Sequence, residues 1–203
     1  MKIEYKGRGI WEITGFKFHD IDVSGMSKGW VPWNKYPTDN REVLDHTVLH
    51  RNWHIDLKNQ LDGLTGLLRR EINNDKIIKF MWPRGLDNID LNSNHKWEIL
   101  KCPPHFRMNK HIDNREVLGV IVINLVDNAE GSGTKIGTYT APNKKGSGVF
   151  FLNSQHTEHM IENKSSKPRY VFYSTLTIWP LSPDLNSEKY KEFLEWNRKT
   201  YGG

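Results

Sequence analysis

The chain has 203 residues, a formal net charge of +5 and a single cysteine, Cys102. Its length suits one domain with a sizeable core, and its 8 Trp, 7 Tyr and 8 Phe exclude disorder for most of the chain. One cysteine excludes an internal disulfide. No apolar h-region follows Met1, and the longest apolar run, Val117 to Val126, is too short to span a membrane. We therefore expect a soluble, cytoplasmic protein.

The basic surplus lies mostly between Lys101 and Arg169. One interpretation is a nucleic-acid ligand, because such proteins carry a positive surface. The other is an ordinary solvated surface together with a pocket for small anions. We favour the second interpretation, since no dense run of Lys and Arg is present.

The first hundred residues predict one strand, one loop and one helix. Residues 9–16 have the apolar spacing of a strand. Residues 20–45 are rich in Gly, Pro, Asn and Trp, which predicts a long ordered loop that either covers a site or packs its aromatic side chains on a flank. From His54 to Asn73, apolar residues recur at helical spacing, with Leu64 and Leu68 on one face.

The second half is rich in β-branched and aromatic residues, separated by turn-forming segments. Six stretches are predicted to be strands: Lys96–Cys102, Val117–Val126, Lys135–Thr140, Val149–Asn153, Glu158–Glu162 and Tyr170–Trp179. Strands of this kind predict a small β-sandwich or barrel of the jelly-roll type. Residues 187–200 predict a C-terminal helix, for which Ser187 is a suitable N-cap.

Two metal-binding side chains lie close together in the segment Lys110–Asn114. His111 and Asp113 are two positions apart, so on an extended strand both point to the same face. They can then contact one metal ion from one side. The tripeptide alone is a weak signal, because a surface histidine beside a turn aspartate has the same spacing.

A second histidine strengthens the metal-site hypothesis. His159 begins a predicted strand after the apolar stretch at 148–153. Two histidines and one carboxylate leave positions open on an iron ion, as non-haem Fe(II) oxygenases require. His156 remains an alternative to His159, which we prefer because it begins the strand. His105 lies near the first motif, but no carboxylate follows it two residues later.

Arg169 follows His159 by ten positions, at the start of the last predicted strand. A guanidinium group can bind a carboxylate through two parallel hydrogen bonds. Its burial inside a β-barrel would be costly unless an anion accompanied it. An ordinary surface ion pair is the alternative role for this arginine.

Together, His111-x-Asp113, His159 and Arg169 resemble the pattern of the Fe(II)/2-oxoglutarate-dependent oxygenase superfamily. The run His-Met-Ile-Glu-Asn-Lys-Ser-Ser-Lys-Pro-Arg, which ends at Arg169, is similar to that of small prolyl and aspartyl/asparaginyl hydroxylases. The run Gly-x-Gly-Val-Phe-Phe from Gly146 resembles the strand before the distal histidine. The likeness covers about residues 96–180.

This resemblance implies a mainly β fold with flanking helices, namely a double-stranded β-helix or jelly roll. It implies that His111, Asp113 and His159 bind Fe(II) and that Arg169 binds the distal carboxylate of 2-oxoglutarate. The implied domain spans residues 1–203, with flanking elements in 1–95, the catalytic core in 96–180 and a C-terminal helix in 181–203.

The implied reaction is hydroxylation of an unactivated C–H bond in a protein side chain or an amino acid, releasing succinate and CO2. O2 would be the co-substrate and ascorbate a stimulant. Asn124 and Tyr139 are candidates to assist the arginine, by strand position only. Asp113 favours hydroxylation, because related halogenases have a small residue there. The segment from Cys102 to Phe106 lacks the Tyr and Pro-Gly pattern of many prolyl hydroxylases, which leaves the subfamily open.

Two alternatives remain at this stage. One is 2-oxoglutarate-dependent oxidation of a nucleic-acid base, which the basic composition favours. Such chemistry needs a stacking aromatic residue for an extruded base, and the sequence identifies none. The other is a non-catalytic jelly-roll binding domain, in which the histidines and the aspartate satisfy one another.

Overall fold

The fold is known from a computed structural model. The structure describes residues 1–18, 22–33, 39–49, 51–74, 97–113, 117–153, 157–177 and 195. The predicted C-terminal helix at 187–200 lies outside the described residues, except for Glu195, which is helical. Among the described helices, none combines the length and hydropathy needed to cross a membrane.

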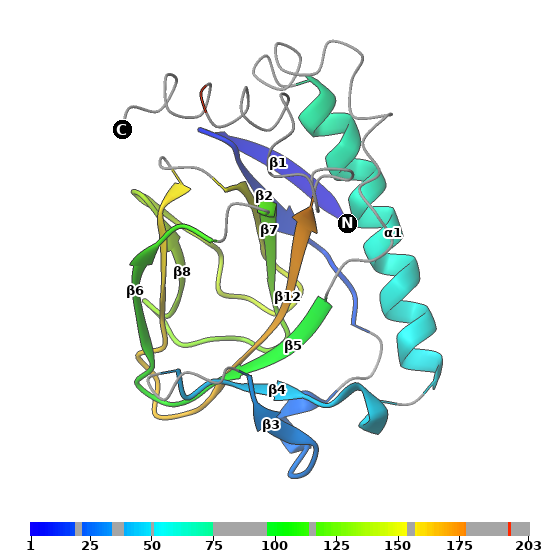
Figure 1. Cartoon of the computed structure of the whole chain (residues 1–203), viewed down its shortest axis with the longest axis vertical. Helices are drawn as coiled ribbons and strands as arrows, with labels where there is room; N and C mark the ends of the chain where they lie inside the picture. The colour runs from blue at the N-terminus through cyan, green and yellow to red at the C-terminus, as the bar shows by residue number, and fades with distance from the viewer. Residues whose placement is uncertain are drawn as a thin grey trace.

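The described part of the chain forms two antiparallel sheets and one long helix (Figure 1). The larger sheet has the strand order β1-β2-β10-β7-β12-β5-β4-β3, and the smaller has β6-β11-β8-β9. The strands are β1 Lys2–Gly7, β2 Ile10–Thr14, β3 Trp30–Pro32, β4 Glu42–Leu44, β5 Trp97–Cys102, β6 Arg107–His111, β7 Val117–Asn124, β8 Gly133–Ile136, β9 Tyr139–Thr140, β10 Gly148–Leu152, β11 His159–Glu162 and β12 Arg169–Thr177.

Strands β5 to β12 form a jelly roll. Successive strands alternate between the two sheets, except that β8 and β9 form a hairpin within the smaller sheet. The resulting order is β10-β7-β12-β5 in one sheet and β6-β11-β8-β9 in the other. This eight-stranded arrangement of two facing sheets is the double-stranded β-helix. The prediction of a mainly β, jelly-roll fold is therefore confirmed.

Two apolar cores hold the layers together. One lies between the two sheets and contains residues such as Val120, Val149 and Phe151. The other lies on the opposite face of the larger sheet and contains Phe150 and Phe172 together with the buried leucines of α1, Arg51–Asn74. Because successive side chains of a strand point to opposite faces, one apolar strand such as β10 serves both cores.

Helix α1 confirms the predicted helix at 54–73, with Leu64 and Leu68 fully buried. Two other segments differ from the structure predicted for them. Residues 135–140 are not one strand, because a turn at Gly137, which has φ +54°, separates β8 from β9. The predicted loop at 20–45 contains the hairpin β3–β4, whose second strand pairs with β5 and so extends the larger sheet.

Gly146 and Gly148 allow neighbouring backbone segments to lie very close to their own backbone. Gly146 has φ +71°, and a Cβ there would lie 2.4 Å from the carbonyl oxygen of Phe16. At Gly148 a Cβ would lie 2.0 Å from the carbonyl oxygen of Val122. Neither position accepts a side chain without moving backbone. The end of β7 is held there as well, because Asn124 exchanges backbone hydrogen bonds with Gly146 and Ser147.

Candidate metal centre

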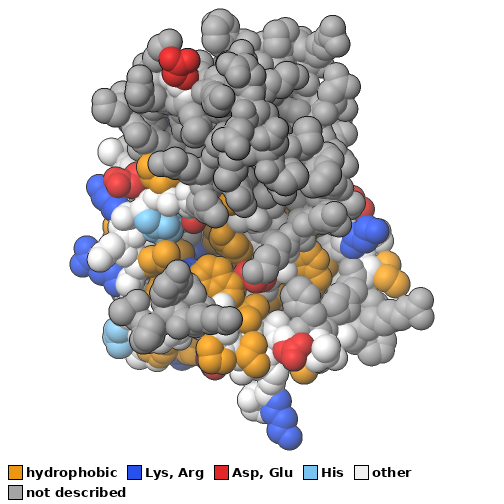
Figure 2. All heavy atoms as spheres, in the orientation of Figure 1, with side chains coloured by type: hydrophobic (Ala, Val, Ile, Leu, Met, Phe, Trp, Pro, Cys, Tyr) orange, Lys and Arg blue, Asp and Glu red, His pale blue; other side chains and the backbone are white. Residues whose placement is uncertain are grey.

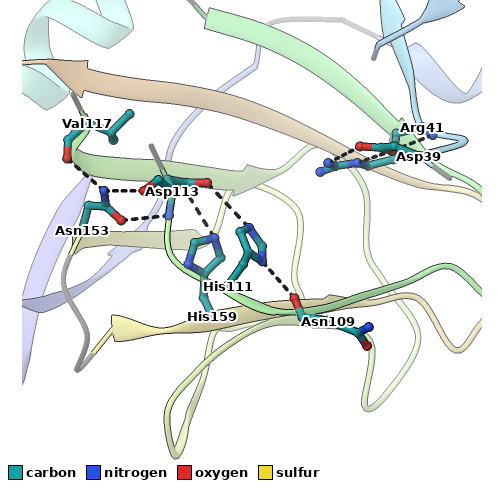
Figure 3. A network of polar contacts seen from close by, with 8 residues as sticks. All are labelled: Asp39, Arg41, Asn109, His111, Asp113, Val117, Asn153 and His159. Carbon is teal, nitrogen blue, oxygen red and sulfur yellow. Dashed lines mark hydrogen bonds and ion pairs between the residues drawn. The ribbon is translucent and has the colours of Figure 1, made fainter. Parts of the chain in front are cut away.

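Three side chains that could hold a metal ion, His111, Asp113 and His159, form a candidate metal-binding cluster at one end of the smaller sheet (Figure 3). His111 is the last residue of β6, and His159 is the first residue of β11. They are direct cross-strand partners, with ring centroids 4.2 Å apart. Asp113 lies two residues beyond β6, and its two carboxylate oxygens lie 3.6 Å from His111 Nε2 and 3.7 Å from His159 Nε2.

One ligand atom from each residue lies within 4.8 Å of the others. Two imidazoles and one carboxylate at such separations form the set of donors that binds non-haem Fe(II) and leaves positions for other ligands. Pairing between β6 and β11 places the two histidines side by side. Because Asp113 is only two residues from His111, its carboxylate then lies near both imidazoles. The side-chain chemistry therefore suits a divalent cation bound by three protein atoms.

His111 has a defined tautomer. Its Nδ1 lies 2.9 Å from the backbone carbonyl oxygen of Asn109. A carbonyl oxygen can only accept, so Nδ1 donates and the lone pair of the neutral ring is on Nε2. That is the nitrogen nearest to Asp113. A backbone contact of this kind orients many metal-binding histidines.

The electrostatic surroundings of the two histidines differ. The adjacent Asp113 carboxylate raises the pKa of His111 above its usual value. Burial dominates at His159 and lowers its pKa to about 4, although Asp113 opposes this shift. Asp113 Oδ2 is buried and accepts no hydrogen bond from the described residues. At neutral pH the imidazole of His159 is therefore neutral, which is the form that can bind a metal ion.

A buried arginine lies on the facing sheet. Arg169, the first residue of β12, is only 2% exposed. Its Nη2 donates to Asn124 Oδ1 at 3.2 Å and to Thr134 Oγ1 at 3.3 Å. Its Nε and Nη1 are buried and have no hydrogen-bond partner among the described residues, and no carboxylate there forms an ion pair with it.

Burial lowers the pKa of Arg169, because removal from water disfavours the charged guanidinium. An arginine nevertheless stays protonated in proteins. A buried cation without a counter-charge costs several kcal/mol. The free N–H groups of this buried guanidinium indicate an anion as its natural partner.

The metal-binding cluster and Arg169 line one cavity between the two sheets. The cavity is partly open to solvent. Between the cluster and the arginine its wall is largely apolar: Leu100, Val120, Val122, Ile161 and Val171. None of these five side chains can hydrogen-bond, so Arg169 and the candidate metal-binding cluster are the groups that could fix the orientation of a ligand in the cavity.

The cavity also has a polar and aromatic wall, part of which comes from the segment 20–45 that was predicted either to cover a site or to pack on a flank. Trp33, Arg41 and Tyr173 contribute to it. The Arg41 guanidinium lies 4.1 Å from the centre of the Trp33 ring, and Trp33 meets Tyr173 edge to face at 5.9 Å. Trp33 Nε1 donates to Glu98, which is buried on β5. On the face shown in Figure 2, apolar side chains gather over the middle of the molecule.

The structure places the other candidate residues in different surroundings. Asn124 contacts Arg169, whereas the Tyr139 hydroxyl donates to Glu12 Oε2 at 2.7 Å. Thr134, which the sequence did not single out, is the second side chain hydrogen-bonded to the arginine. His105 is exposed, has φ +57° and does not belong to the metal-binding cluster. His156 lies outside the described residues.

No protein-family model matches the sequence, and no curated protein matches it. Among solved structures, the chain is similar to a Pseudomonas putida prolyl-4-hydroxylase, with 12% identity, 68% of this chain and 69% of that chain covered, and a TM-score of 0.49. It is similar to the viral collagen prolyl hydroxylase of Paramecium Bursaria Chlorella virus-1 in a 2-oxoglutarate complex, with 12% identity, 84% and 96% covered, and a TM-score of 0.48.

An oxidoreductase of the 2OG-Fe(II) oxygenase family from Burkholderia pseudomallei is similar with 11% identity, 87% of this chain and 72% of that chain covered, and a TM-score of 0.39. These likenesses are remote in both sequence and superposition. The strand order defines the jelly roll independently of them. A functional proposal therefore depends on the side chains in the cavity.

Proposed function

We propose that this protein is an Fe(II)- and 2-oxoglutarate-dependent oxygenase. The observation that carries the proposal is Arg169, a buried cation with two unpartnered donor atoms that opens into the same cavity as His111, Asp113 and His159. Such a site offers three protein ligands for one metal ion and, separately, an arginine that can bind a carboxylate. It fits a small dicarboxylate that contacts both the metal ion and the arginine. 2-Oxoglutarate has this chemistry, with a 2-oxo acid group for the metal and a second carboxylate for the arginine.

Each residue has a distinct task in this proposal. The imidazoles of His111 and His159 and the carboxylate of Asp113 would hold Fe(II). Arg169 would bind the distal carboxylate of 2-oxoglutarate, and Thr134 would help to orient the guanidinium through the hydroxyl that now accepts from Nη2. When bound, Fe(II) and 2-oxoglutarate supply O2-dependent oxidation of a C–H bond, with release of succinate and CO2.

The apolar wall of the cavity has a second effect. It keeps bulk water from the anion-binding arginine and from the metal-binding cluster, which strengthens electrostatic contacts there. We place the substrate at the wall formed by Trp33, Arg41 and Tyr173, because these side chains line the same cavity. A protein side chain or an amino acid, hydroxylated at an unactivated C–H bond, is the proposed substrate class.

The proposal is tested by anaerobic titration of the metal-free protein with Fe(II) and 2-oxoglutarate. A bidentate 2-oxo acid on Fe(II) gives a weak metal-to-ligand charge-transfer band in the visible region. We expect this band in the wild type and its loss in His159→Ala, which lacks one of the three ligands. Arg169→Ala should form the band only at a concentration of 2-oxoglutarate at least about tenfold higher, since a tenfold loss corresponds to only 1.4 kcal/mol.

Two histidine variants serve as controls. His105→Asn removes an imidazole outside the cluster and keeps a residue type that tolerates the positive φ. His156→Ala removes the alternative distal ligand. Both should retain the band. Failure of the wild type to bind Fe(II) would support the binding-domain alternative, and loss of the band in His156→Ala alone would reassign the distal ligand.

A further inference from the structure

Asp113 is the one member of the metal-binding cluster that lies outside a strand. β6 ends at His111, so no sheet pairing fixes the backbone of Asp113. Its carboxylate nevertheless lies at nearly equal distances from the two imidazoles. A side chain with this freedom would lose that position through small backbone rotations. Some other contact must hold the backbone of this residue.

That contact comes from Asn153, the residue that follows β10. Its Oδ1 accepts from the backbone N–H of Asp113 at 3.0 Å, and its Nδ2 donates to the carbonyl oxygen of Asp113 at 3.2 Å (Figure 3). The same Nδ2 donates to the carbonyl oxygen of Val117 at 3.1 Å. One carboxamide thus satisfies both backbone groups of Asp113, as a paired strand would, and ties them to the start of β7.

Asn153 is itself firmly placed. It is 7% exposed and follows a fully buried strand that pairs with β2 on one side and β7 on the other. The preceding Leu152 donates its backbone N–H to Gly9 at 2.8 Å, and its carbonyl oxygen accepts from the Thr157 hydroxyl. Thr157 is two residues before His159. The end of β10 therefore anchors Asp113 directly and lies one hydrogen bond from the segment that leads into His159.

We propose that Asn153 is a positioning residue for the metal centre, which sets the place of the Asp113 carboxylate between the two imidazoles. This inference rests on the metal site of the proposed function. It requires the carboxamide in particular, because Asp113 offers one donor and one acceptor that a single side chain must match. An aspartate would keep the acceptor but lose both donated bonds and would face two carbonyl oxygens. An alanine would lose each of the three hydrogen bonds described above.

The chain contains a matched control. Asn163 is 2% exposed, and its Nδ2 donates to the carbonyl oxygens of Pro103 at 2.8 Å and Lys167 at 2.9 Å. It is therefore another buried asparagine that ties backbone segments together in the same jelly roll, but it contacts neither Asp113 nor a histidine of the cluster. Asn163→Ala should destabilise the fold to a degree comparable with Asn153→Ala.

The experiment measures Mn(II) binding to the full-length, metal-free protein, using the electron paramagnetic resonance signal of free Mn(II), with thermal unfolding measured in parallel. Asn153→Ala and Asn153→Asp should raise the Kd for Mn(II) about 10- to 100-fold, the usual effect of removing a partner that orients a metal ligand. Asn163→Ala should lower the Tm but leave the Kd within about threefold of the wild type, because Asn163 follows the end of β11, whereas His159 begins that strand. If Asn153→Ala does not fold, Asn153→Asp, which keeps one bond, supplies the comparison.

The outcomes separate the two proposals. Wild-type affinity in the Asn153 variants would overturn the positioning role while leaving the metal site intact. An equal loss of affinity in Asn163→Ala would also overturn it, since the effect would then follow from general destabilisation. If the wild type itself bound no Mn(II), the proposed function and this inference would fall together. The inference is supported if only the Asn153 variants bind Mn(II) more weakly than the wild type while their Tm values match that of Asn163→Ala.

Discussion

His111 and His159 lie side by side, yet their surroundings shift their pKa values in opposite directions. Asp113 raises the pKa of His111, and burial lowers that of His159 to about 4. The unfolded chain titrates near the ordinary value of 6.5 at both positions. A lowered folded-state pKa means that His159 contributes stability above pH 6.5 and loses it as the pH falls through 4. The raised pKa of His111 has the opposite effect: its contribution to stability is complete below pH 6.5 and is lost as the pH rises above that value. The pH ranges over which the two histidines change the stability therefore do not overlap.

We therefore predict that the metal-free protein loses stability between pH 6.5 and 4 because buried His159 must become charged. Compared with His159→Asn, the wild type should lose about 2 kcal/mol more of its free energy of unfolding over this range. Urea denaturation at several pH values measures the difference, and the subtraction removes the titration of carboxylates common to both proteins. Parallel curves for the two proteins would show that His159 is not held neutral by burial.

At the scale of elements, helix α1 supports the larger sheet on the face opposite to the cavity. Leu64 and Leu68 are fully buried against that sheet, whereas Ile55 on the same helix is 50% exposed. The core under α1 includes Phe172 of β12, and Arg169 on the same strand contributes to the cavity on the other side. The helix thus packs against the strand that carries Arg169, and none of its described side chains lines the cavity.

Leu64→Ala should consequently destabilise the protein by about 2–5 kcal/mol, since it removes a fully buried side chain and leaves a cavity. Ile55→Ala should change the free energy of unfolding by less than about 0.5 kcal/mol, because half of that side chain already contacts water. Both are measured by urea denaturation. At temperatures where Leu64→Ala remains folded, its Kd for 2-oxoglutarate with Fe(II) should match the wild type. A large loss of affinity would mean that α1 shapes the cavity directly.

The elements also show which features of the fold the sequence could predict. Strands buried on both faces, such as β7 and β10, are continuous apolar runs and were predicted within one or two residues. β1 and β6 were not predicted, because polar and exposed residues dominate both and leave no apolar alternation. The hairpin β3–β4 is short and interrupted by turn-forming residues, so its pairing with β5 depends on contacts distant in sequence.

The same limit applies to the site. Each proposed metal ligand has a chemical type that narrows its roles, and short spacing links His111 to Asp113. Thr134 and Asn153 act through backbone or arginine contacts across the two sheets, and such residue types occur on many surfaces. Asn153 has one local signal, since it is a polar residue that directly follows a buried apolar strand. Only the folded arrangement shows what its carboxamide binds.

At the scale of the whole molecule, one cavity contains a buried Asp113 oxygen that accepts no hydrogen bond from the described residues and an Arg169 guanidinium that pairs with no anion among them. Both features destabilise the ligand-free state. Ligands that bind only the folded protein add RT ln(1 + [L]/Kd) to its stability, about 2.7 kcal/mol at 100 times Kd. The folded state as a whole should therefore respond to the metal and to 2-oxoglutarate, even though each contacts only a few residues.

We predict that Mn(II) raises the Tm and that 2-oxoglutarate raises it further only when the metal is present, because the 2-oxo acid group needs the metal as its partner. At saturating concentrations, each step should raise the Tm by roughly 5–10 °C for a chain of this size. Differential scanning fluorimetry under argon measures both increments. In Arg169→Ala the metal increment should persist, whereas the 2-oxoglutarate increment should fall to less than half. If the Tm increment from 2-oxoglutarate were unchanged in Arg169→Ala, the buried arginine would not bind the distal carboxylate. Another anion would then have to supply the counter-charge of Arg169.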